Sequence, residues 1–182
     1  MNESNGELFR EGLLLRPYEH KDQKAVRTLF KRVNRDLAPA HMKQAFEAYV
    51  ELSLKEEIDI IPQYYNAERG RSFRVAVKGT SVCGFFGLEP TGDSTIELRR
   101  MYVDPSYRRR GVARWMLDQA ERISRQEGWT KMVLSTSELQ SAAVMFYRST
   151  HFTLVRDELV STTTNKTVGR GIRRLYFEKS LI

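Results

Sequence analysis

Cysteine, histidine and long apolar runs are scarce in this chain, and each shortage excludes a class of protein. Cys83 is the single cysteine among 182 residues, so neither an internal disulfide nor a thiolate metal cluster can form. Its apolar neighbours favour a buried structural thiol over a nucleophile. The three histidines are scattered without metal spacing, so we assign no metal. No apolar run approaches the roughly 20 residues of a membrane span, and we expect no membrane partner.

Export signals and the common nucleotide-binding loops are also missing. Residues 1–12 are polar and acidic instead of basic and then apolar, so we expect a flexible start to the chain and a cytoplasmic protein. The chain has no G-x-G-x-x-G loop, because Gly84 and Gly87 fall within a predicted strand, and it has no G-K-[ST] sequence. Dinucleotide and P-loop nucleotide sites are therefore excluded.

The charge balance is strongly basic, which makes an anionic partner plausible. Thirty Lys and Arg residues against 23 Asp and Glu give a net charge of +7 and a pI near 9.6. Nucleic acid, a membrane surface or the phosphates of a cofactor would each satisfy this excess. The position of the arginine cluster has to decide among them.

Hydrophobic periodicity predicts one α/β domain with a mixed sheet covered on both faces, and not an alternating βα array. The segments 59–72 and 161–171 lack periodicity, so we expect a substrate-facing loop and a mobile stretch. Strands are predicted at 13–15, 73–77, 82–88, 95–103, 131–136, 152–160 and 172–177, and helices at 22–33, 42–50, 112–123 and 141–150.

The segment from Glu97 to Ala113 carries the strongest functional signal. A predicted strand runs through a basic turn, Arg108 to Arg110, into Gly111, which opens a helix. The first turn of a helix exposes unpaired N–H groups with positive dipole character, and glycine lets a ligand approach the backbone closely. A pyrophosphate fits this arrangement, while the alternative is a solvated charge run. Because the cluster does not lie along a groove-reading helix, we expect no nucleic-acid partner.

The segment resembles the coenzyme-binding signature [RQ]-x-x-G-x-[GA] of the GNAT superfamily of acetyltransferases, which Arg108 to Ala113 match in full. The resemblance implies an α/β acyl-CoA N-acyltransferase fold: a central, mostly antiparallel twisted sheet of about seven strands flanked by four helices. It implies acetyl-CoA as cosubstrate, an amine-bearing acceptor, and a homodimer as in many family members. The implied coenzyme-binding residues are Met101, Tyr102, Val103, Arg108, Arg109, Arg110, Gly111, Val112, Ala113, Arg114, Gln140, Ala143 and Tyr147.

A second family pattern, N-x-x-A-x-x-x-Y-x-x-x-G-F, is matched only in part. Ala143, Tyr147 and Phe152 agree, whereas Gln140 replaces the usual Asn and His151 the usual Gly. Gln140 keeps both donor and acceptor groups. His151 should avoid the positive φ that glycine permits, so we expect the turn after the helix to differ. These departures keep open a catalytically silent acetyl-CoA sensor.

Acetyl transfer to an amine needs a base, an acid and a polarised carbonyl. Glu97 is the candidate base, since strict alternation gives it one face with Arg99, Met101 and Val103. Among these partly apolar neighbours, burial would raise its pKa. Its alternative role is an ion pair with Arg99 or Arg100, and a strand bulge would change the face.

Tyr147 is the candidate acid, because the resemblance aligns it with the family tyrosine, although helical spacing suits a core aromatic equally well. A backbone N–H between Met101 and Val103 would polarise the carbonyl. The acceptor stays open among amino acids, polyamines, aminoglycoside-like amines, peptide termini and protein lysines. Residues that select it should lie in the first two helices, near Tyr64 and Tyr65, and in 161–171.

Overall fold

The computed structural model describes residues 7–9 and 12–182 and arranges them as a mixed α/β fold. The strands of this part of the chain are β1 (Glu7–Phe9), β2 (Leu13–Pro17), β3 (Ser72–Lys78), β4 (Ser81–Gly92), β5 (Thr95–Val103), β6 (Lys131–Ser137), β7 (Thr153–Val160) and β8 (Ile172–Ser180). The helices are α1 (Gln23–Leu37), α2 (Lys43–Glu56), α3 (Ile61–Tyr64), α4 (Val112–Gln126) and α5 (Ser141–Ser149). Every predicted strand and helix is present, with ends that differ by a few residues.

The strands form one sheet in the order β1-β2-β3-β4-β5-β6-β8-β7. Neighbours are antiparallel except β5 and β6, which are parallel. This confirms the expected mixed and mostly antiparallel sheet. The described residues contain eight strands against the expected seven or so, and the additional one, β1, lies within the segment that we expected to be flexible.

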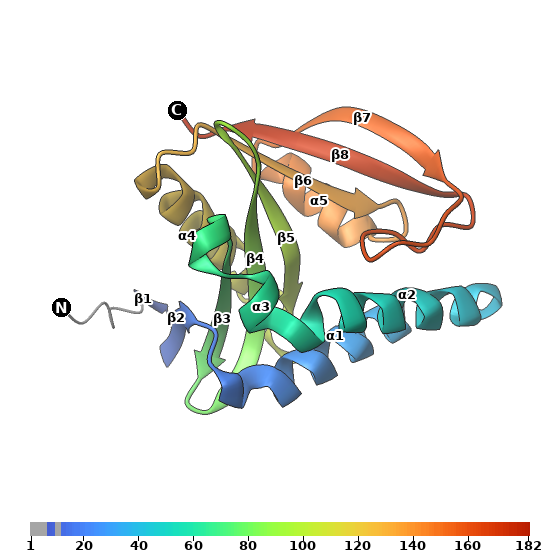
Figure 1. Ribbon diagram of the computed structural model, residues 1–182, viewed down its shortest axis with the longest axis horizontal. Helices are drawn as coiled ribbons and strands as arrows, with labels where there is room; N and C mark the ends of the chain where they lie inside the picture. Colours follow the sequence, from blue (N-terminus) through green and yellow to red (C-terminus); the bar gives the residue numbers. More distant parts are fainter. Residues whose placement is uncertain (1–6, 10–11) are drawn as a thin grey trace.

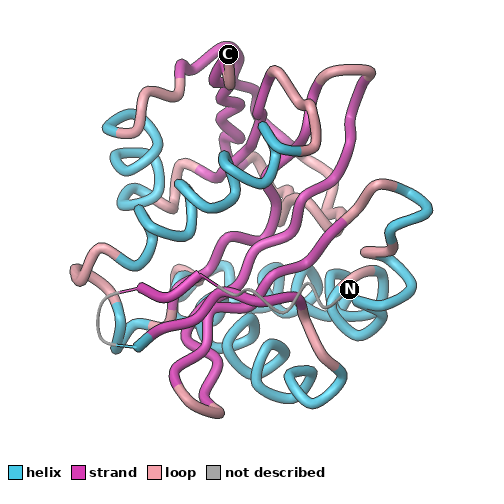
Figure 2. The backbone as a smooth tube through the Cα atoms, turned by 90° about the vertical axis from the view of Figure 1, so that its left-hand side faces the viewer, coloured by secondary structure: helices cyan, strands magenta, loops and turns pink. Residues whose placement is uncertain are grey.

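Helices cover both faces of the sheet (Figure 2). One face packs against α1 and α2, whose apolar stripes contribute residues such as Phe30 and Phe46, both nearly inaccessible to solvent. The other face packs against α4 and α5, through residues such as Met116 and Tyr147. Two hydrophobic cores therefore form, one on each side of the sheet. They consist of apolar side chains at helical spacing on these four helices and of alternating side chains on the strands.

The sheet splits between its two parallel strands. β5 pairs with β6 only from Thr95 to Glu97, opposite Lys131 to Val133, and no further pair of the two strands follows among the described residues. Figure 1 shows β6, β7 and β8 fanning away from β4 and β5 beyond this point. The divergence opens a space in the middle of the sheet, between β5 and β6, and each of these strands is followed in the chain by one of the two family patterns.

Two segments expected to lack structure are more ordered. The 59–72 segment was expected to be a loop, but it contains α3 and short 3-10 turns, and Ile61 and Tyr65 are buried. Burial of these side chains against the α1 and α2 core explains the helical turns that periodicity did not indicate. In the 161–171 segment a bridge joins Thr164 to Thr167, and Ser53 of α2 donates a hydrogen bond to the Asn165 carbonyl.

Cys83 is fully buried and free, as expected for a structural thiol, and burial raises the pKa of its thiol group. None of the helices in the described part of the chain combines the length and apolar character needed to cross a membrane.

Candidate functional site

A cavity of about 880 Å³ fills the space between the diverging strands. The two family patterns, which lie far apart in the sequence, both contribute to its wall. The lining residues come from α1 and α2, from β5 and the start of α4, from β6 and α5, and from the 161–171 segment and β8. Of the predicted site residues, the cavity wall includes Glu97, Met101, Tyr102, Val103, Arg108, Arg109, Gly111, Val112, Ala113, Arg114, Gln140, Ala143 and Tyr147.

The cavity exposes unpaired backbone groups on the edges of β5 and β6. Beyond Glu97 the edge of β5 that faces β6 has no strand partner in the described structure, while its other edge stays paired with β4. Met101 to Val103 therefore present main-chain donors and acceptors to the cavity. An extended ligand with amide groups can bind such an edge as an added strand does.

Gly111 begins helix α4 at the wall of the cavity. Its φ of 81° is in the left-handed region, which glycine adopts without strain, and Arg109 before it also has a positive φ of 60°. No described acceptor takes a hydrogen bond from the amides of Val112, Ala113 or Arg114, whereas the Trp115 amide already bonds the Gly111 carbonyl. Free donors at a helix start are groups that suit an anion, as the sequence predicts for this turn.

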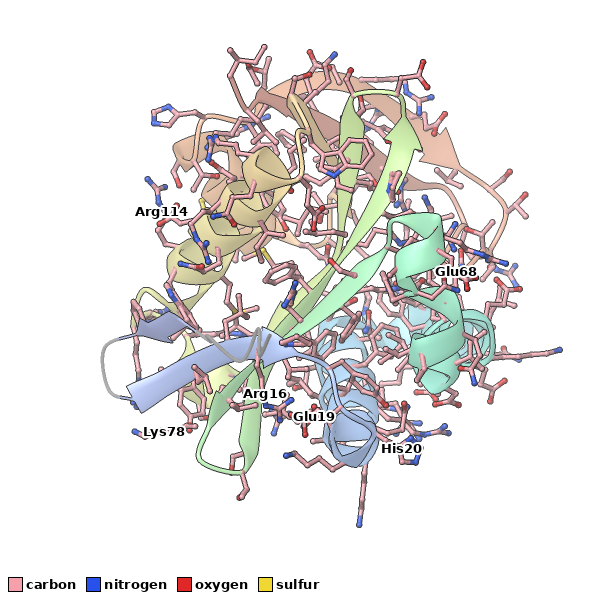
Figure 3. The ribbon with its side chains drawn as sticks, turned by 60° about the vertical axis from the view of Figure 1, so that its left-hand side comes forward. Arg16, Glu19, His20, Glu68, Lys78 and Arg114 are labelled. Carbon is pink, nitrogen blue, oxygen red and sulfur yellow. The ribbon has the colours of Figure 1, made fainter. Side chains whose placement is uncertain are left out.

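The arginines in and beside this turn differ in whether they line the cavity. Arg108, Arg109 and Arg114 line the cavity, but Arg110 is not among the lining residues, and its guanidinium lies 5.8 Å from the Tyr107 ring centre. Figure 3 shows Arg114 on the outer side of α4, where its guanidinium reaches Asp118 at 3.5 Å. The hydrogen-bond donors that this turn presents to the cavity are therefore mainly backbone N–H groups, and not the guanidinium of any one arginine.

A bulge in β5 overturns the predicted alternation. Phe85 pairs with Tyr102 but Gly87 pairs with Arg99, so β5 holds one extra residue, and Arg100 has a φ of 51°. The bulge brings Arg99 and Arg100 to the α1 and α2 face. Met101 and Val103 instead pack against the α4 and α5 core, opposite to Glu97. The prediction that they share a face with Glu97 is therefore wrong.

Both arginines of the bulge contact one carboxylate, Glu57, which follows α2. Glu57 Oε2 lies 2.6 Å from Arg99 Nη2 and 2.7 Å from Arg100 Nη2, and the Glu57 side chain has no exposed surface. Burial alone would raise the pKa of this carboxyl group, but the charges of Arg100 and Arg99 lower it to about 2. Tyr65 adds a hydrogen bond to the other carboxylate oxygen. Glu57 therefore stays ionised and anchors the bulge.

Glu97 lies at the start of this charged region and is only 7% exposed. Its Oε2 atom accepts a hydrogen bond of 2.7 Å from Lys166 Nζ and lies 3.7 Å from Arg99 Nη1. The predicted ion pair between Glu97 and Arg99 is therefore present. The shorter contact of Glu97 is with Lys166, which sequence spacing did not indicate. Of the neighbours that strict alternation suggested, Arg99 is present and the apolar Met101 and Val103 are replaced by the charge of Lys166.

Tyr147 extends from α5 into the cavity wall among aromatic side chains. Its ring centre lies 5.7 Å from that of Phe152 and 6.2 Å from that of Phe177. Burial raises the pKa of its phenol, so the hydroxyl is protonated at neutral pH. Within the described residues this hydroxyl has no hydrogen-bond partner, so both of its predicted roles, core aromatic and cavity donor, are compatible with its position.

The two departures from the second family pattern have different outcomes. Gln140 lies just before α5, lines the cavity and accepts a hydrogen bond from the Thr136 hydroxyl. His151 adopts a φ of 67°, so it enters the region normally used by glycine, and the expectation of a different turn was wrong. The strain of this conformation, about 1–2 kcal/mol, is small enough for the surrounding packing to offset.

Three residues of the cavity region were not singled out by sequence reasoning, although one of them, Lys166, lies in the 161–171 segment that was expected to help select the acceptor. Glu57, Lys166 and Arg174 meet β5 and β6 from distant parts of the chain, and no short motif contains them. Glu57 follows Glu56 at the end of a helix, and such an acidic pair is typical of a solvent-exposed helix end. The Tyr64 and Tyr65 pair, expected near the substrate, is absent from the described cavity wall, and Tyr65 is buried beside Glu57.

No group of three or more His, Cys, Asp or Glu side chains suited to a metal ion occurs in the described ranges 7–9 and 12–182.

Comparison with known proteins agrees with this geometry. Human N-acetyltransferase 8 is 30% identical over 115 residues, which are 60% of this chain and 51% of that protein. N-acetylaspartate synthetase of Xenopus tropicalis is 29% identical over 134 residues, 71% of this chain and 48% of that protein. The chain thus spans about half the length of the curated relatives it matches.

A solved structure extends the comparison to nearly the whole chain, and a family model covers residues 31–152. The paia N-acetyltransferase of Thermoplasma acidophilum, solved in complex with coenzyme A, has a TM-score of 0.72 over 93% of this chain and 99% of its own. At 16% identity this likeness concerns the fold. The model of the acetyltransferase (GNAT) family matches residues 31–152, which include the bulged strand, the Gly111 turn and Tyr147. The chain therefore belongs to the acetyltransferase (GNAT) family.

Proposed function

We propose that this protein transfers an acetyl group from acetyl-CoA to the amine of an acceptor. The observation that supports this most is the continuity of the cavity, which joins the free amides at the start of α4 to Glu97 and Tyr147. A long anionic thioester and a separate amine can therefore meet in one cavity. Family membership supports the acetyl transfer, and the amine rests on the chemistry of Glu97.

The residues of the cavity fit the coenzyme in two respects. The unpaired amides of Val112, Ala113 and Arg114 suit a diphosphate, and a side chain at Gly111 would bring strain at that conformation. The open edge of β5 near Met101 suits the amide groups of a pantetheine arm. When bound there, acetyl-CoA supplies a thioester carbonyl as the electrophile.

Glu97 is proposed to accept the proton of the acceptor amine. An alkyl ammonium group has a pKa near ~10.4, so it arrives charged and must lose a proton before it attacks. The Lys166 ammonium now bonded to Glu97 marks where a cation is stabilised. An incoming ammonium can exchange with Lys166 at this carboxylate, after which the proton passes to Glu97, directly or through water.

Two further groups are proposed to assist the carbonyl and the leaving thiolate. A backbone N–H of the bulged segment, Met101 to Val103, donates to the carbonyl oxygen as negative charge develops there. The Tyr147 hydroxyl, kept protonated by burial, donates to the sulfur as the C–S bond breaks. The acyl group then passes directly to the amine, with no acyl-enzyme.

The test is release of coenzyme A thiol from acetyl-CoA in the presence of amines from each class named above, with product masses to identify the acetylated atom. We expect release to depend on an amine, and acetyl-CoA alone to raise the melting temperature by binding the native state. Thermal protection without consumption by any amine would indicate the silent sensor. Binding of nucleic acid with a steep salt dependence, and none of coenzyme, would refute both.

A further inference from the structure

Arg174 of β8 is a half-buried arginine without a carboxylate partner. Its guanidinium donates to the Ser135 hydroxyl and lies 5.7 Å from the Tyr176 ring centre, and it forms no ion pair with any described residue. Burial lowers its pKa, which records the cost of holding this charge away from water. Arg174 also lines the cavity, so an anion there would offset that cost.

The neighbours of Arg174 add to the positive charge. It interacts electrostatically with Glu97, Arg100 and Tyr49, so it belongs to the charged region around the bulge. The linked side chains of this region, among the described residues, are the cations Arg71, Arg99, Arg100, Lys166 and Arg174 and the carboxylates Glu57, Glu89 and Glu97. Arg174 forms no ion pair with any of these three carboxylates. Glu158, its cross-strand partner on β7, accepts a hydrogen bond from Tyr176 and pairs with Arg156 instead.

The position of Arg174 separates it from the expected diphosphate site. Ser135 and Arg174 alternate with Leu134 and Leu175, which pack into the core on the α4 and α5 face. Arg174 therefore projects to the opposite face, where Tyr49 of α2 lies, while the free amides belong to α4. The anion that Arg174 suits thus lies beside Glu97 on the acceptor side of the cavity.

The acceptor side is also closed by the 161–171 segment. Asn165 accepts hydrogen bonds through its carbonyl from Ser53 and, at 2.5 Å, from Arg100, and Lys166 bonds Glu97. These contacts join the segment to α2 and β5 across the cavity. The segment therefore covers part of this side of the cavity, and a free metabolite fits such a space more readily than a protein chain.

We propose that the acceptor is an amino acid whose carboxylate binds the Arg174 guanidinium while its amine faces Glu97. This rests on the proposed acetyl transfer and names its substrate class. The planar guanidinium matches a carboxylate with two parallel hydrogen bonds, whereas a plain amine or polyamine would add positive charge to an already cationic region. Glu97 and Arg174 together thus select a zwitterion.

The experiment compares each common L-amino acid with its carboxamide, using acetyl-CoA and thiol release. A hydrogen bond to a charged group contributes about 1.5–3 kcal/mol, so we expect the best amino acid to exceed its amide roughly 10- to 100-fold in kcat/KM. Arg174→Gln should abolish this preference by raising KM for the amino acid, with KM for acetyl-CoA unchanged. Arg174→Lys keeps the positive charge but loses the planar guanidinium that forms two parallel hydrogen bonds. This variant should therefore retain part of the preference for the amino acid.

Arg27→Gln is the matched control, since it removes an exposed guanidinium paired with Asp59. It should behave as the wild type. Carboxamides used as well as acids, acidic peptides preferred to free amino acids, or a preference unchanged in Arg174→Gln would each overturn the proposal. So would a variant whose only defect is a higher KM for acetyl-CoA.

A binding measurement separates this proposal from the acetyl transfer itself. Should no amine consume acetyl-CoA, the transferase function fails, and calorimetric titration of the same amino acids into the protein with coenzyme A decides the carboxylate site. Binding by the wild type that Arg174→Gln loses supports the site. Absence of binding, or equal binding by both proteins, overturns it.

Discussion

The buried carboxylate of Glu57 gives the sharpest prediction about what holds the site together. Glu57→Gln keeps the shape of the side chain but removes its charge. Arg100 would lose its ion-pair partner in the described structure, while Arg99 would keep Glu89 at 2.9 Å. Removing one member of a buried pair leaves an uncompensated charge and typically costs about 3–5 kcal/mol of unfolding free energy.

The lowered pKa of Glu57 leads to a stabilisation of the same sign and order of magnitude. Burial opposes ionisation, but Arg100 and Arg99 outweigh it and lower the pKa from 4.5 to about 2. A shift of this size corresponds to about 3 kcal/mol of stability, in agreement with the first estimate. Because the folded pKa is depressed, this contribution is complete above the unfolded pKa and is lost as the pH falls toward 2.

The assay is equilibrium unfolding in urea, followed by the fluorescence of Trp115 and Trp129. We expect Glu57→Gln to lower the unfolding free energy by about 3 kcal/mol at pH 6. The difference from wild type should shrink by about 2 kcal/mol between pH 6 and pH 3, because the wild-type carboxylate begins to take up protons in the unfolded chain. Both proteins should have the same urea m-value.

Asp59→Asn is the control, because Asp59 lies two residues further along and pairs with Arg27 at the surface. Exposed pairs contribute at most about 1 kcal/mol, so this variant should be close to wild type. A Glu57→Gln difference below about 1 kcal/mol, or one of constant size from pH 6 to pH 3, would refute the assignment of Glu57 as an ionised anchor.

Three further predictions concern the coenzyme site and the chemistry. Gly111→Val and Gly128→Val both force a branched residue to positive φ, at 81° and 87°, and should destabilise the fold by a similar amount of about 1–2 kcal/mol. Only the Gly111 variant should lose the rise in melting temperature with acetyl-CoA, and equal retention by both would contradict the diphosphate site. Tyr147→Phe should lower kcat roughly 100-fold or more with little change in KM for acetyl-CoA; an unchanged kcat removes Tyr147 from the mechanism. Glu97→Gln should lower kcat/KM strongly at pH 7 and less at pH 9.5, where more of the acceptor is already neutral, and a pH-independent loss speaks against a base.

Local patterns were sufficient for most of the strands and helices and for the glycine turn that precedes α4. The spacing of Val26, Leu29 and Phe30 is a property of one helix, and all three are buried as their period indicates. Gly111 likewise adopts its left-handed conformation at the helix start where the signature stands. In both cases the residues that determine the local structure are close together in the chain, so the structure can be predicted from a short segment of sequence.

Contacts between segments that are distant in the sequence could not be predicted from short patterns. The bulge at Arg100 depends on Glu57, which is 43 residues away, and it reverses the face assignment that alternation alone implied. His151 shows the same limit, because packing around it offsets a conformation that its residue type disfavours.

The order of the strands and helices, the turn at Gly111 and the family could thus be inferred from residues close together in the chain. The charges around Glu97 could not. Lys166 is 69 residues from Glu97, and Ser135 is 39 residues from Arg174, so folding alone brings each pair into contact. Ion pairs carry no periodicity and tolerate any sequence separation, which is why the acceptor side of the cavity becomes visible only once the sheet has formed and split.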